Sequence, residues 1–166
     1  MPRLKEKTAA AIASGHNRRL KTGLAVGFGG EDAAGYFAAI RGGLWMSCET
    51  PRDLPFEDAQ FDAVALETAS VGRESVREIN RVLKPEGFLY FSVPERDGKQ
   101  DGYTAPEIYR IVREGFDIVD LKMPKWWKFG IGGRTITVSA RKKAWKEHKS
   151  FLREGSLPFT PFRERK

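Results

Sequence analysis

The residues best suited to hold a ligand follow a short apolar run near the start of the chain. Residues 23–26 are apolar, and Gly27, Phe28, Gly29 and Gly30 come directly after them. Glycine lets the backbone turn tightly and lets other groups come close to it. Many α/β domains use such glycines simply to pass from a strand to a helix. The turn alone therefore leaves both a cofactor site and a plain connection open.

Polar residues also follow two later apolar runs, residues 61–66 and 88–93. Open α/β sheets place their ligands at the edge where the parallel strands end. The residues that we single out at these two ends are Glu67, Thr68 and Ser70, and then Pro94, Glu95 and Arg96. We select Glu67 as the first candidate for a cofactor or substrate contact, with an ordinary loop carboxylate as the alternative.

Metal and thiol chemistry have little support. His16 and His148 are far apart and have no partners at ligand spacing, so we expect no metal site. The lone Cys48 excludes an internal disulfide and has no neighbouring His or Lys to activate it. We expect Cys48 to be a small buried apolar residue.

A basic and aromatic segment is a second candidate surface. Lys125, Trp126, Trp127 and Lys128 combine cations with flat rings, which could stack on bases and touch phosphates or lie at a membrane interface. Alternatively, the tryptophans cap the core while the lysines stay solvated. With the basic residues 142–166, this segment would form one face for RNA, a protein or another anionic macromolecule.

Composition indicates a globular protein. Of 166 residues 40% are hydrophobic, and 29 Lys and Arg against 22 Asp and Glu give a net charge of +7. We expect a single domain with a core over residues 23–141, a leading helical extension over 1–22, and a basic helix and tail over 142–166. No stretch has the apolar length of a signal peptide core or a membrane span, so we expect a cytoplasmic protein in a reducing compartment.

Hydrophobic periodicity and helix-stop residues predict alternating strands and helices. Helices are expected over residues 4–14, 31–40, 71–83, 103–113 and 144–153, with residues 84–87 as a helix stop and Thr104 as a cap. Strands are expected over residues 23–28, 44–48, 61–66, 88–93, 116–123 and 134–141. This order predicts a three-layer α/β fold with a mostly parallel sheet, ending in an antiparallel hairpin.

Two blocks give the chain a resemblance to a known family. Residues 54–64 read LPFEDAQFDAV, and residues 77–89 read REINRVLKPEGFL. Both are similar to blocks of the class I S-adenosylmethionine-dependent methyltransferases, in particular type 11, the group of the ubiquinone and menaquinone biosynthesis enzymes. The resemblance covers about residues 23–141 and implies a Rossmann-like fold with S-adenosylmethionine as cofactor.

By this resemblance, the glycine turn is the cofactor loop. Cofactor-binding residues are then Gly27, Phe28, Gly29, Gly30, Glu49, Asp53 and Glu67, where Glu49 would hold the ribose and Asp53 would lie near the adenine. The family often places substrate contacts at positions equivalent to Pro94, Glu95 and Arg96. The alternatives for Glu49 and Asp53 are a solvated carboxylate and a turn residue.

The chain departs from the family pattern before residue 54. Ala25 replaces the usual acidic residue of the first strand, and Glu31 replaces the usual third glycine. Residues 31–53 have room for one helix and one strand rather than two of each, which predicts a fold one strand and one helix short.

Three functions therefore remain open. The first is a methyltransferase acting on an unknown acceptor, either a small molecule or an anionic macromolecule. The second is an inactive methyltransferase-like module that binds RNA or protein through the basic aromatic face. The third is a nucleotide-sugar or dinucleotide enzyme, which the blocks at residues 54–64 and 77–89 disfavour.

Overall fold

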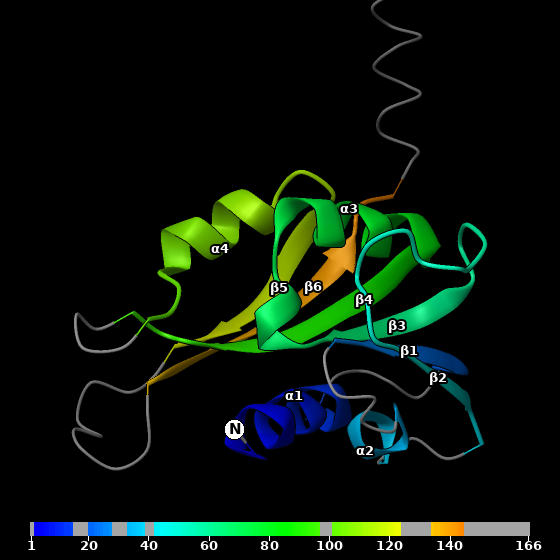
Figure 1. The fold of residues 1–166 in the computed structure, drawn as a ribbon, viewed down its shortest axis with the longest axis horizontal. Coiled ribbons are helices and arrows are strands. Elements are labelled where there is room, and N and C mark those ends of the chain that lie inside the picture. The colour runs from blue at the N-terminus through cyan, green and yellow to red at the C-terminus, as the bar shows by residue number, and fades with distance from the viewer. Residues whose placement is uncertain are drawn as a thin grey trace, which may run out of the picture.

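The computed structural model describes residues 2–14, 20–27, 33–38, 42–96, 101–123 and 134–144. They form one mixed sheet with helices on both faces (Figure 1). Helices α1 (Pro2–Ser14) and α2 (Ala33–Phe37) cover one face, and α3 (Arg73–Val82) and α4 (Ala105–Val112) cover the other. This is the predicted three-layer α/β architecture.

The sheet has six strands in the order β2-β1-β3-β4-β6-β5. The strands are β1 (Thr22–Val26), β2 (Leu44–Cys48), β3 (Phe61–Leu66), β4 (Leu83–Pro94), β5 (Phe116–Lys122) and β6 (Thr135–Lys142). The first four run parallel to one another. Strand β6 is antiparallel to both β4 and β5, as the expected terminal hairpin requires.

Two clusters of buried side chains hold the layers together. The larger one lies under α3 and α4 and includes Val76, Ile79 and Ile108, while the smaller one lies under α1 and α2 and includes Ile12 and Phe37. Apolar side chains on both faces explain why β1 and β3 are almost continuously hydrophobic. Cys48 is only half-buried and contacts the edge of the larger cluster, so the expectation of a buried residue was only partly right.

The residues predicted to stop the helix after α3 lie inside a strand instead of a turn. The helix ends at Val82, but Lys84, Pro85, Glu86 and Gly87 belong to the start of β4 rather than to a separate turn. Phe61 pairs with Leu83 and Ala63 pairs with Phe88, so β4 carries extra residues here, and Glu86 has a φ of 63°. The breaker residues therefore form an irregularity inside the strand.

A buried lysine closes the same helix end. The ammonium group of Lys142 donates hydrogen bonds to the carbonyls of Asn80 and Leu83, at 2.5 and 2.7 Å. Carbonyls at the end of a helix lack hydrogen-bond partners within the helix. A cation at this position also interacts favourably with the negative end of the helix dipole. Burial lowers the pKa of Lys142.

Helix α4 begins with the predicted cap. The Thr104 hydroxyl accepts a hydrogen bond from the Glu107 N–H at 3.4 Å, and the Glu107 carboxylate accepts from the Thr104 N–H at 2.8 Å. These bonds from Thr104 lower the pKa of Glu107. The helix spans Ala105–Val112, slightly less than expected, and the helix expected over residues 31–40 is described only as Ala33–Phe37. The helix expected over residues 144–153 lies outside the described residues.

Candidate functional site

Strands β2, β1, β3 and β4 end side by side at one edge of the sheet. The chain passes from β1 to β2 on one side and then returns to β3 on the other side of β1. Such a reversal leaves a crevice between the ends of the two central strands, and ligands of open α/β sheets bind there. The candidate site therefore centres on Gly27, after β1, and Glu67, after β3.

Gly27 and Glu67 are packed directly against each other. The Gly27 N–H donates to the Cys48 carbonyl at 3.0 Å, and the Glu67 N–H donates to the Val26 carbonyl at 2.8 Å. Gly27 is buried with a φ of 153°, and a Cβ at this position would lie 2.0 Å from Cγ of Glu67. Only glycine leaves room for this carboxylate beside the end of β1.

The other two cofactor candidates lie toward the outer strand. Glu49 follows β2 directly and is exposed. Asp53 is also exposed, and its φ of 50° is a left-handed conformation that Asp tolerates better than most residues. Its neighbour Arg52 forms an ion pair of 3.4 Å with Glu74 at the start of α3. Asp53 thus lies in a turn beside α3, which is compatible with either interpretation of this residue.

The candidates after β4 are already engaged with other residues. Glu95 forms an ion pair of 2.7 Å with Arg134, and Arg96 forms one of 2.9 Å with Glu107. The backbone of Tyr103 bonds to Pro94 and Arg96, at 2.9 and 3.0 Å. Ion pairs and backbone hydrogen bonds therefore hold the residues at this end of the sheet in place, and the charges of Glu95 and Arg96 are paired.

Sequence reasoning missed a group of hydroxyls beneath this edge. Ser92 Oγ accepts from the Thr8 hydroxyl at 2.9 Å and lies 3.0 Å from the Thr137 hydroxyl, so α1, β4 and β6 meet there. The Thr68 hydroxyl donates to the Ser92 carbonyl at 2.7 Å. Within the described residues, Ser70 Oγ is buried without a hydrogen-bond partner. The signal was a serine inside the otherwise apolar run of residues 88–93.

The remaining site candidates are not described. Phe28, Gly29 and Gly30 of the glycine turn, and Lys125, Trp126, Trp127 and Lys128 of the basic aromatic segment, lie outside the described residues. Within the part that is described, no three His, Cys, Asp or Glu residues come together in a way that could hold a metal ion. No helix among the described residues has the length and apolar character needed to cross a membrane.

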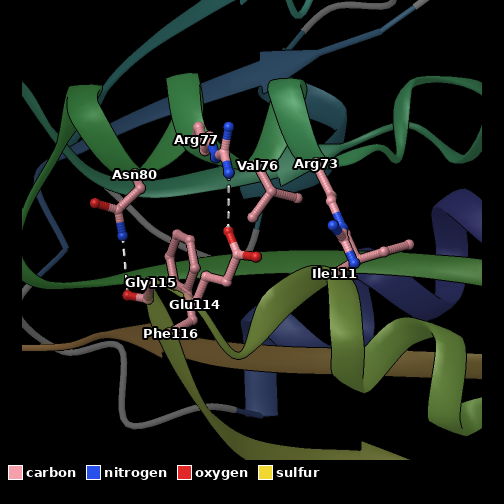
Figure 2. A pocket seen from close by; sticks show the side chains of 8 residues that line it. All are labelled: Arg73, Val76, Arg77, Asn80, Ile111, Glu114, Gly115 and Phe116. Carbon is pink, nitrogen blue, oxygen red and sulfur yellow. Dashed lines mark hydrogen bonds and ion pairs between the residues drawn. The ribbon is translucent and has the colours of Figure 1, made fainter.

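A groove of about 280 Å³ lies elsewhere, between α3 and the start of β5 (Figure 2). Its lining residues are Arg73, Val76, Arg77, Asn80, Ile111, Glu114, Gly115 and Phe116, and none of them was a predicted site residue. An ion pair of 3.3 Å joins Arg77 to Glu114, and the Asn80 amide donates to the Gly115 carbonyl at 2.9 Å. These contacts hold α3 to the turn after α4.

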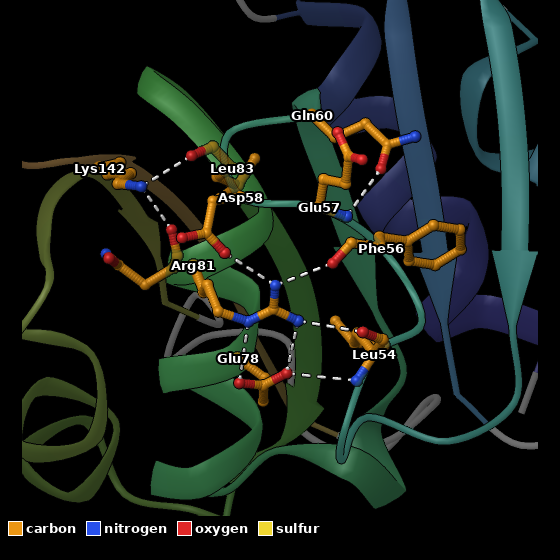
Figure 3. A network of polar contacts seen from close by, with 10 residues as sticks. Leu54, Phe56, Glu57, Asp58, Gln60, Glu78, Arg81, Leu83 and Lys142 are labelled. Atoms are coloured by element: carbon orange, nitrogen blue, oxygen red, sulfur yellow. Dashed lines mark hydrogen bonds and ion pairs between the residues drawn. The ribbon is translucent and has the colours of Figure 1, made fainter.

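The two sequence blocks meet at the opposite edge from the candidate site (Figure 3). Arg81 donates hydrogen bonds to the carbonyls of Leu54 and Phe56, at 3.0 and 2.8 Å, and forms ion pairs of 2.9 Å with Asp58 and Glu78. The hydrogen bond from Arg81 lowers the pKa of Glu78. In this structure, the blocks fix the loop that leads into β3.

Comparisons with known proteins agree with this architecture. A protein-family model described as a methyltransferase domain matches residues 30–91. This range includes Glu49, Asp53, Glu67 and both sequence blocks. Residues 30–91 are therefore similar to a methyltransferase domain. The predicted resemblance to class I methyltransferases and the predicted Rossmann-like fold are both confirmed.

Solved methyltransferases share the fold over most of this domain. One is the Burkholderia thailandensis 1,6-didemethyltoxoflavin-N1-methyltransferase with bound 1,6-didemethyltoxoflavin and S-adenosylhomocysteine, at 21% identity, a TM-score of 0.61, and coverage of 84% of this chain and 79% of that one. Another is a Methanosarcina mazei S-adenosylmethionine-dependent methyltransferase, at 16% identity, a TM-score of 0.55, and coverage of 78% and 96%.

A third comes from Haloferax volcanii and was solved in complex with the Trm112 methyltransferase activator. It is 15% identical, has a TM-score of 0.59, and the match covers 86% of this chain and 91% of that one. No curated protein matches the chain.

Proposed function

We propose that the chain is an S-adenosylmethionine-dependent methyltransferase whose cofactor binds where β2, β1 and β3 end. The main support is the packing of Gly27 against Glu67 at the reversal point of the sheet. A buried glycine and a carboxylate are held together there, at the position where this class of sheet binds ligands. The structurally similar Burkholderia enzyme was solved with S-adenosylhomocysteine.

The residues present at this edge fit such a cofactor. The missing side chain of Gly27 leaves room for the Glu67 side chain at the end of β1, and the glycine turn of the sequence, residues 28–30, follows directly. Glu49 and Glu67 supply carboxylates that can accept hydrogen bonds from ribose hydroxyls or an amino group. When bound, S-adenosylmethionine supplies a methyl group on a positively charged sulfur, which leaves readily.

The protein's part in catalysis is alignment of the acceptor. The edge after β4 contributes a rigid surface, because Glu95 and Arg96 are already neutralised by Arg134 and Glu107. We assign acceptor contact to Pro94, Glu95 and Arg96, and to Lys125, Trp126, Trp127 and Lys128. The two lysines of this second group would favour an anionic acceptor, and its two tryptophans would favour an aromatic one.

Titration calorimetry with S-adenosylhomocysteine tests cofactor binding. We expect the wild-type chain to bind and Glu67→Gln to bind about ten to a hundred times more weakly, because a hydrogen bond to a charged group contributes about 1.5 to 3 kcal/mol. The matched control is Glu74→Gln, a carboxylate exposed at the start of α3, which should leave the affinity unchanged.

Two outcomes would contradict the proposal. One is the absence of binding by the folded wild-type protein at millimolar ligand, and the other is equal affinity in Glu67→Gln. Binding of NAD in place of S-adenosylhomocysteine would support a dinucleotide enzyme instead. Methyl transfer from labelled S-adenosylmethionine to an acceptor panel would then separate an active enzyme from an inactive binding module.

A further inference from the structure

The two edge strands of the sheet are built differently. Strand β5 carries Asp117, Asp120 and Lys122, and its pairing with β6 shifts register between Ile118 and Asp120. Charges and irregular pairing are the usual means by which an edge strand avoids pairing with another chain. Strand β2 reads LWMSC and has neither feature.

Strand β2 also exposes apolar side chains. Leu44 is 75% exposed and Met46 is 43% exposed, although both belong to a regular strand. Trp45 stacks on Phe37 of α2 with ring centroids 4.7 Å apart, so it lies on the α2 face. Because neighbouring side chains of a strand alternate, Leu44 and Met46 lie on the opposite face. The apolar surface on this face of the sheet therefore extends to the edge strand β2, where Leu44 and Met46 are exposed.

The backbone of β2 is also available on its outer side. The Leu44 N–H donates to the Lys21 carbonyl at 2.7 Å, and the Cys48 carbonyl accepts from the Gly27 N–H at 3.0 Å. The backbone N–H and C=O groups of residues 44, 46 and 48 thus point toward β1. Because these groups alternate along a strand, those of Trp45 and Ser47 point away from β1, to the outer side. Among the described residues, no strand pairs with this outer side.

We propose that β2 is a self-association edge, which pairs antiparallel with β2 of a second copy of this chain about a two-fold axis at Met46. In this register Trp45 of each copy lies opposite Ser47 of the other, so their outward N–H and C=O groups can form closed hydrogen-bonded pairs. Leu44 lies opposite Cys48, and the two Met46 residues face each other. The overlap covers the full strand and continues the sheet from one copy into the next.

The distribution of charge favours β2 over β5 as the strand at which two copies of the chain meet. Each copy carries a net charge of +7, so two copies repel each other, and the repulsion is least where no like charges face each other directly. The uncharged LWMSC strand meets that condition against itself, whereas two β5 strands would bring Asp117 and Asp120 of both copies together. Salt should strengthen the pairing, since it screens the repulsion between the two basic bodies.

Sedimentation velocity of the full chain, from about 1 µM to about 1 mM, measures this association. The interface is short, so we expect a dimer with a dissociation constant in the micromolar to millimolar range that tightens between about 50 and 500 mM salt. A monomer over the whole range would overturn the proposal, as would a dimer that salt weakens.

Two variants and a control locate the interface. Met46→Lys places two cations face to face, and Ser47→Pro removes an outward N–H without breaking a bond to β1. We expect both variants to stay monomeric, with unchanged circular dichroism. Val119→Lys, which alters a 59% exposed residue on β5, should dimerise like the wild type. Dimerisation retained by both β2 variants, or lost in Val119→Lys, would place the interface elsewhere and refute the proposal.

Discussion

Gly27 and Glu67 share one small volume, so a change at either residue acts on the other. A Cβ at residue 27 would lie 2.0 Å from Cγ and 2.1 Å from Cβ of Glu67, and the φ of 153° is unfavourable for any other L-residue. We expect Gly27→Ala to lower the free energy of unfolding by about 2 to 4 kcal/mol, from backbone strain and overpacking together. Urea denaturation measures this loss.

A double-mutant cycle separates the two causes. In a Glu67→Gly background the clashing atoms are gone, so Gly27→Ala should cost at least about 1 kcal/mol less than it does alone. Equal costs in both backgrounds would mean that backbone strain alone makes residue 27 a glycine.

The positions of candidate site residues in the fold could be predicted where these residues follow a strand. Glu67 was selected because parallel strands end at a common edge, whereas Gly27 was selected from the glycine turn and Glu49 from the family resemblance. The structure brings the ends of these three strands side by side. The ion pair between Glu95 and Arg134 could not be foreseen in the same way. It joins residues 39 positions apart, and it depends on the register of β6 against β4.

The loop before β3 depends on a single side chain of α3. Arg81 reaches the carbonyls of Leu54 and Phe56 as well as two carboxylates, a fork geometry that the single ammonium group of lysine cannot reproduce. We expect Arg81→Lys to lower the free energy of unfolding by about 1 to 3 kcal/mol and to speed proteolysis between residues 54 and 60.

The matched control lies one turn earlier on the same helix. Arg77 is more exposed and makes one ion pair, with Glu114, so Arg77→Lys should change stability by less than about 0.5 kcal/mol. Similar losses in the two variants would show that Arg81 acts as an ordinary surface charge.

Element boundaries followed from the sequence where a short apolar run is bounded by turn residues. The bounds of β2 and β3 were predicted without error, and those of α3 nearly so. The start of β4 was not, because Pro85 and Gly87 are typical breakers. Here they are accommodated inside the strand, where Phe61 pairs with Leu83 before the register shifts. This start of β4 becomes visible only from its pairing with β3, which the sequence alone does not show.

Acid stability of the whole protein should depend on Asp62, at the edge opposite the candidate site. Burial alone would raise the pKa of this carboxyl, but hydrogen bonds from Lys84, Lys21 and Thr22 outweigh burial and lower it below the ordinary 3.8. A folded pKa below the unfolded one means that the stabilisation is present above pH 3.8 and is lost as the pH falls through the folded value.

The comparison with Asp62→Asn measures that contribution. At pH 7 we expect the variant to unfold about 1 to 3 kcal/mol more easily, and this difference should shrink steadily as the pH falls below about 4. Asp117→Asn, an exposed change on β5, should show no such trend. If the difference in the free energy of unfolding stays constant down to pH 2.5, the variant loses stability because the amide packs or bonds differently, and not because the carboxylate charge is gone.

At the scale of the molecule, the layer order and the mostly parallel sheet followed from alternating elements. The position of β6 between β4 and β5 sets the order in which the sheet can be completed during synthesis. Strands β4 and β5 leave the ribosome before β6, yet they do not pair with each other in the folded sheet, because each pairs with β6. Both keep an unfilled edge until residue 142 has emerged, and Lys142 then reaches the end of α3. We expect a nascent chain that stalls before β6 to expose two unpaired strand edges at once and to become a substrate for chaperones.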